Sequence, residues 1–118
     1  MNLRPEQQTL LDIIASDGRK IPRWIDTKKE EHHHAFLRIQ NVFEWAYDLC
    51  YPEFLEESTI EIIDLQIASL FKQIKDPALN KKATVYVVKK LNDYLKMALE
   101  TECYEAYQNI NNYLNPVE

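Results

Sequence analysis

The chain of 118 residues contains a single glycine, Gly18, and only five prolines. A protein built from β-strands needs a chain reversal about every 8–12 residues, and tight reversals draw heavily on glycine and proline. This scarcity of turn-forming residues argues against an all-β fold and favours helices joined by few loops. At this length one domain is expected, and an apolar content of 46% is enough for a single buried core.

Apolar residues recur at helical spacing along five stretches, which predicts an all-α fold, a single compact bundle of four to five helices. We expect one domain over residues 1–118, with helices at about 5–15, 27–50, 58–75, 82–100 and 101–114. The first helix is predicted to end at Asp17-Gly18, because glycine tolerates the left-handed conformation that closes helices. A break near Glu100–Glu102 is expected to separate the last two helices, with Thr101 as the new cap. Before that break, helical spacing predicts a main apolar stripe with Tyr94 at its edge, made of Val87, Val88, Leu91, Leu95, Ala98 and Leu99.

Two sequence patterns predict helix starts. Thr27 with Glu30, and Ser58 with Glu61, have the spacing of a capping box, in which each side chain bonds the other residue's free backbone N–H. Pro52 is expected to stop the second helix near residue 50, and Asp76-Pro77 is expected to stop the third helix and to restart the chain as the next one.

The connector from Arg19 to Asp26 is predicted to be extended, because Pro22 disfavours helix at the residue before it. Basic residues surround Trp24, a pattern that can grip nucleic acid by phosphate contacts and base stacking. However, residues 1–34 carry six acids and six bases, so no basic face results. We favour the simpler interpretation, in which Trp24 and Ile25 anchor the connector to the core.

Negative charge is concentrated in the middle of a chain whose net charge is −5. The stretch from Ile39 to Phe71 has no Lys or Arg, seven carboxylates, and aromatic residues set among them. Tyrosine and tryptophan often anchor interfaces, and an acidic surround speeds encounter with a basic partner. The predicted partner-binding residues are Glu44, Trp45, Asp48, Tyr51, Glu53, Phe54, Glu56, Glu57, Glu61 and Asp64.

A purely structural interpretation of the same stretch stays open. Tyr47 and Phe54 would then belong to the core, and the acids would solvate one face. Glu56, Glu57 and Glu61 would stabilise the N-terminus of the predicted 58–75 helix through its dipole.

No catalytic or cofactor signature is present, so we expect no enzyme activity, no cofactor and no metal. His32, His33 and His34 are consecutive, about 100° apart on a helix, and cannot chelate one ion together. His32 is expected at the edge of the core and the other two in solvent. One glycine excludes a glycine-rich phosphate loop. The two cysteines, Cys50 and Cys103, are expected to be buried, reduced thiols.

A second candidate surface consists of Tyr86, Met97 and Tyr104, which fall within about 20° of one another on a helical wheel, away from the main apolar stripe. A helix that is apolar on two sides is either enclosed within its own fold or docks on another molecule. The second case makes this a candidate self-association face, and the protein a homodimeric structural or regulatory adaptor.

We therefore expect a small acidic protein-binding inhibitor, of the immunity, antitoxin or phage anti-defence type. It would occlude a basic, nucleic-acid-binding surface of a target protein, without binding nucleic acid or membrane itself. No signal-peptide-like or membrane-spanning apolar run is present, so a cytoplasmic location is expected, in its own cell or in a host cell. A helical DNA-binding regulator is a minor alternative. The last two predicted helices carry the basic residues Lys81, Lys82, Lys89, Lys90 and Lys96, but their charge is offset by Asp93, Glu100, Glu102 and Glu105.

Overall fold

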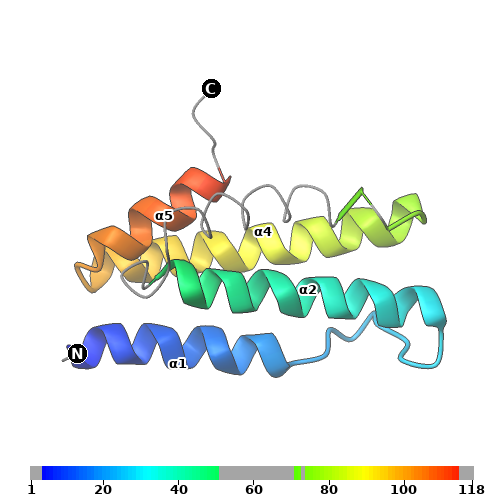
Figure 1. Cartoon of the computed structure of the whole chain (residues 1–118), viewed down its shortest axis with the longest axis horizontal. Coiled ribbons are helices and arrows are strands. Elements are labelled where there is room, and N and C mark those ends of the chain that lie inside the picture. Colours follow the sequence, from blue (N-terminus) through cyan, green and yellow to red (C-terminus); the bar gives the residue numbers. More distant parts are fainter. Residues whose placement is uncertain (1–3, 51–70, 73, 115–118) are drawn as a thin grey trace.

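The computed structural model describes residues 4–50, 71–72 and 74–114, and within them it contains four α-helices and no strand. These are α1 (Pro5–Arg19), α2 (Glu30–Leu49), α4 (Pro77–Glu100) and α5 (Tyr104–Leu114). Helices α1, α2 and α4 pack side by side, and α5 folds back along α4 (Figure 1). The all-α bundle is confirmed. The predicted start at Ser58 and most of the predicted 58–75 helix lie outside the described residues.

Helix α1 continues past its predicted end, to Arg19, so the prediction that Asp17-Gly18 terminates it was wrong. No glycine has a positive φ among the described residues, and Gly18 is an ordinary helical position. An added Cβ there would lie 3.1 Å from Cβ of Phe43. Glycine is therefore present because α1 and α2 approach closely at this point, and not because the helix ends.

Helix α2 begins at Glu30, and the predicted Thr27–Glu30 capping box does not form. The preceding turn is organised by Asp26 instead. Its carboxylate accepts a hydrogen bond from the Lys28 amide at 3.1 Å, and its own amide donates to Nδ1 of His32 at 3.0 Å. These local bonds satisfy backbone groups in a turn and so delay the start of the helix. The helix ends at Leu49, close to the predicted residue 50.

Helix α4 begins five residues earlier than predicted. Asp76 caps it by accepting hydrogen bonds from the amides of Ala78 at 2.9 Å and Leu79 at 3.3 Å. Pro77 occupies the first helical position, where its missing N–H costs nothing. The stop signal at Asp76-Pro77 is thus also the start signal of the next helix.

The predicted break between the last two helices is confirmed at Glu102, whose φ of 58° is left-handed. Thr101 plays a different part from the one expected. Its hydroxyl donates to the Met97 carbonyl at 2.8 Å, so it closes α4 and does not cap α5. A reversal of direction at this point lets α5 return along α4.

The core lies between the four helices. The predicted α4 stripe is confirmed at its centre and corrected at its edges: Val87, Leu91, Leu95 and Ala98 are buried, but Val88 and Leu99 are 39% and 50% exposed. Tyr94, expected at the edge of the stripe, is fully buried. Ile25 is buried and Trp24 packs on the core, which confirms that they anchor the connector.

Candidate functional site

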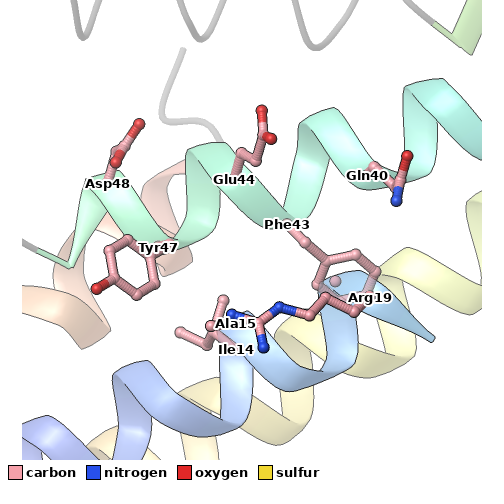
Figure 2. Close-up of a pocket in the computed structure, with 9 residues that line it drawn as sticks. Ile14, Ala15, Arg19, Gln40, Phe43, Glu44, Tyr47 and Asp48 are labelled. Atoms are coloured by element: carbon pink, nitrogen blue, oxygen red, sulfur yellow. The ribbon is translucent and has the colours of Figure 1, made fainter.

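A groove runs between α1 and α2 and encloses about 490 Å³ (Figure 2). On the α1 side it is lined by the small residues Ala15 and Gly18. On the α2 side it is lined by residues three, four and seven positions apart, which share one helix face. The lining residues are Ile14, Ala15, Gly18, Arg19, Gln40, Phe43, Glu44, Tyr47 and Asp48.

The groove has a mixed lining, with the polar side chains of Arg19 and Gln40 beside apolar residues, and two carboxylates at its rim. Phe43 and Tyr47 lean from α2 toward α1, where Ile14 lies (Figure 2). The carboxylates of Glu44 and Asp48 point away from α1 (Figure 2). A long side chain could therefore lie along the exposed ring of Tyr47 with its head group at the rim.

Glu44 and Asp48 are one helical turn apart and have no counter-charge in the described part of the chain. The ion pairs found there involve other residues, and Arg19 is not close enough to either carboxylate to form one. Partial burial raises the pKa of Asp48 above its usual range, and the neighbouring charge of Glu44 raises it further. Both causes disfavour the charged form of Asp48. A cation bound at this rim would stabilise that charged form.

Removing one of these two charges is expected to stabilise the isolated protein. With a pKa raised in the folded state, Asp48 binds more protons folded than unfolded. Stability therefore falls as pH rises from the unfolded-state pKa of about 3.8 through the raised folded-state pKa, and stays reduced at neutral pH. Glu44→Gln or Asp48→Asn should raise the free energy of unfolding at pH 7 by about 0.2–0.5 kcal/mol, the size of an i,i+4 charge pair.

Urea titrations at pH 7 and pH 3 measure this effect, and the gain should vanish at the lower pH. Glu31→Gln is the matched control on the same helix. Glu31 lies in the first turn of α2, where the dipole favours a carboxylate, so its neutralisation should lower stability slightly. If Glu44→Gln and Asp48→Asn lose stability at pH 7 as the control does, the claim that these two charges destabilise the folded protein is contradicted.

No known family matches this chain. Comparison with curated proteins and with solved structures likewise finds no match. No helix among the described residues is long and apolar enough to cross a membrane.

Of the predicted partner-binding residues, the structure brings Glu44 and Asp48 together. Trp45 is partly buried and packs on the core. Tyr47, which the structural interpretation placed in the core, is 38% exposed and lines the groove. The remaining predicted residues lie outside the described part of the chain: Tyr51, Glu53, Phe54, Glu56, Glu57, Glu61 and Asp64.

Arg19 and Gln40 line the groove but were not predicted as site residues. Nothing in their local sequence singles them out, because the groove depends on how α1 and α2 approach each other. The one available signal was Gly18, since a glycine inside a helical pattern often marks a close backbone approach.

The three residues of the candidate self-association face have different surroundings. Tyr86 is partly buried and its ring meets those of Trp24 and Phe43 edge-on, at centroid distances of 6.2 and 6.0 Å. Met97 packs on the core, whereas Tyr104 is 63% exposed. Association of two copies through these residues stays a prediction.

The histidines lie where the sequence placed them. His32 is partly buried and accepts the Asp26 hydrogen bond, while His33 and His34 are exposed. Nε2 of His34 lies 3.8 Å from Oε1 of Glu30. Within the described residues no group of three or more His, Cys, Asp or Glu side chains is placed to hold a metal ion.

Proposed function

We propose that this protein is a small acidic inhibitor that binds a target protein and occludes a basic, nucleic-acid-binding surface on it, as immunity proteins, antitoxins and phage anti-defence proteins do. One observation carries the proposal: Glu44 and Asp48 form a like-charged pair without a counter-ion among the described residues, at the rim of a groove. The proposed action is stoichiometric binding, without catalysis.

The groove suits a lysine or arginine side chain from the target. Such a side chain buries its hydrocarbon stem on apolar surface while its charged head stays at a polar edge. Ile14 and Phe43 are buried beneath the groove, so the exposed ring of Tyr47 offers that apolar surface, and the two carboxylates offer charge-assisted hydrogen bonds to the head group. A guanidinium can also stack on the face of the Tyr47 ring.

Two carboxylates that destabilise each other in the free protein are stabilised by a bound cation. The isolated chain therefore holds an unfavourable local charge arrangement that binding corrects. A face that merely solvates the protein has no need of such a pair beside a groove. This reasoning favours recognition of a basic partner over simple solvation.

Affinity capture from the native host's lysate tests the proposal. Wild-type protein should retain one basic protein at low salt and release it at about 1 M salt, where the screening length falls to about 3 Å. Heparin should displace that protein, because it competes for a nucleic-acid-binding surface. The variant Glu44→Lys/Asp48→Lys should not capture it.

With the purified partner, the double variant should bind at least about 30-fold more weakly, since losing one side of a desolvated charge pair costs about 2 kcal/mol or more. Glu30→Lys/Glu31→Lys, a charge reversal of equal size at the other end of α2, should change affinity far less. Equal losses in the two variants would contradict a role for the groove rim. If only the protein itself is captured, at any salt concentration, the proposed inhibitor function is overturned and the homodimeric adaptor is favoured.

A further inference from the structure

A second cavity, away from the α1–α2 groove, has both cysteines in its wall. It encloses about 250 Å³ and is lined by Cys50, Cys103 and residues from α1 and α5. Cys50 is the residue that caps the C-terminus of α2, and Cys103 directly precedes α5. Those two helix ends lie at the same end of the molecule, and α2 packs on α5 (Figure 1). The fold thus brings to one cavity two thiols that are 53 positions apart in the sequence.

The two thiols have different surroundings. Sγ of Cys103 lies 3.2 Å from the hydroxyl of Thr101 and 3.9 Å from Nη2 of Arg4. The same guanidinium donates to the carbonyls of Thr101 and Glu102 at 3.2 and 3.1 Å, which holds it beside the thiol. Cys103 stands immediately before α5, and its carbonyl accepts a hydrogen bond from the Tyr107 amide at 3.0 Å, in the first turn of that helix. Reactive cysteines occur in such surroundings, beside a guanidinium and at a helix N-terminus.

Cys50 is the less reactive of the two thiols. Both thiols are buried, Cys50 being 7% and Cys103 6% exposed, so what separates them is the Arg4 guanidinium beside Cys103 and the position of Cys50 at the C-terminal end of α2, where the helix dipole disfavours a thiolate. Burial raises the pKa of Cys50 to about 12, and the neighbouring Cys103 contributes to the rise. A thiol of this kind is suited to complete a reaction begun at its neighbour, and not to begin one itself.

We propose that Cys50 and Cys103 form a redox-active pair that closes to an intramolecular disulfide when the protein meets a peroxide. In the first step the Cys103 sulfur attacks hydrogen peroxide; an S–O bond forms, the O–O bond breaks and water leaves, giving a sulfenic acid. In the second step the Cys50 sulfur attacks that sulfur; the S–S bond forms and the S–O bond breaks. The hydroxyl departs as water with the thiol proton of Cys50.

The overall reaction removes two hydrogen atoms from the protein and reduces one peroxide to two waters. The product joins the C-terminal end of α2 to the N-terminal end of α5. Oxidation would thus crosslink α2 three residues after Tyr47 and two after Asp48, which both line the α1–α2 groove. The disulfide itself does not depend on the proposed inhibitory function, and its test needs no partner.

Mass spectrometry of the full chain, treated with hydrogen peroxide under native conditions, tests the proposal. The intact mass should fall by two hydrogen atoms, both thiols should resist iodoacetamide, and dithiothreitol should reverse both changes. Digestion should yield one peptide that contains Cys50 joined to one that contains Cys103. Thiols that stay free, thiols that gain oxygen without the loss of two hydrogens, or a link between two chains would each overturn the pair.

Two further measurements separate the roles of the cysteines. Dimedone should trap the sulfenic acid on Cys103 in Cys50→Ala, whereas Cys103→Ala should leave Cys50 unmodified. In the wild type, conversion of the sulfenic acid to the disulfide should speed up about tenfold per pH unit from neutral pH upward, because the attacking Cys50 thiolate becomes more abundant. A rate independent of pH would contradict the assigned order, and the wild-type mass measurement stands even where a variant fails to fold.

Discussion

Replacing Tyr94 by phenylalanine should lower the free energy of unfolding by about 1.5–3 kcal/mol, the worth of a hydrogen bond to a charged group. The Tyr94 hydroxyl donates to Oδ2 of Asp17 at 2.6 Å, between residues that are both buried. Phenylalanine keeps the ring in the core but leaves that side of the carboxylate without a donor. Urea unfolding at pH 7 measures the loss, and Tyr86→Phe serves as the control on the same helix.

Tyr86 is only partly buried, and its hydroxyl makes no hydrogen bond with another described residue, so the control should change stability by less than about 0.5 kcal/mol. The two variants should also differ in their dependence on pH. Burial alone would raise the pKa of Asp17. The hydrogen bonds from Tyr94 and Lys20 and the charges of Lys90 and Lys20 outweigh it, so the pKa is lowered.

The sign of the pH effect follows from that lowered pKa. The stability that Asp17 contributes is complete above its unfolded pKa of about 3.8 and is lost as pH falls through the lower, folded value. Tyr94→Phe raises the pKa of Asp17 in the folded state. The difference in the free energy of unfolding between wild type and variant should therefore narrow as pH falls below about 4. A gap that stays constant from pH 7 to pH 2 would show that packing, and not the hydrogen bond, is lost.

A larger side chain at position 18 should destabilise the protein by forcing α1 away from α2. Gly18→Val is expected to cost about 1–3 kcal/mol, the usual cost of overpacking, because its Cβ would lie 3.1 Å from Cβ of Phe43. Gly18→Ala meets the same contact, but alanine gains about 1 kcal/mol of helix propensity over glycine. Its stability should therefore stay within about 1 kcal/mol of wild type.

Ala15→Val controls for the low helix propensity of valine. Ala15 lies one turn earlier on α1 and lines the same groove. Thermal and urea unfolding of the three variants should rank Gly18→Val as the least stable. If Ala15→Val is destabilised as much as Gly18→Val, the cost comes from β-branching, and the close approach at Phe43 is not what requires glycine.

The pair of carboxylates in the candidate site can be predicted from the sequence, because four-residue spacing puts Glu44 and Asp48 on one helix face whatever the helix packs against. The groove beside them cannot be predicted in this way. It exists because Ala15 and Gly18 bring α1 close to α2, and this selects Arg19 and Gln40 as lining residues. The cavity with the two cysteines also depends on packing, since Cys50 and Cys103 are far apart along the chain.

The same division runs through the fold. Helix content, the break near Glu102 and the buried centre of α4 follow from periodicity and turn chemistry, which act between neighbours in sequence. The position of Gly18 inside α1 does not, since it reflects the close approach of Phe43 from another helix. The start of α2 at Glu30 is set by local bonds of Asp26, which the capping-box pattern does not reveal. Periodicity also places Tyr94 at the edge of a stripe. Its full burial was decided by a partner 77 residues away, because only the folded chain can offer Asp17 to its hydroxyl.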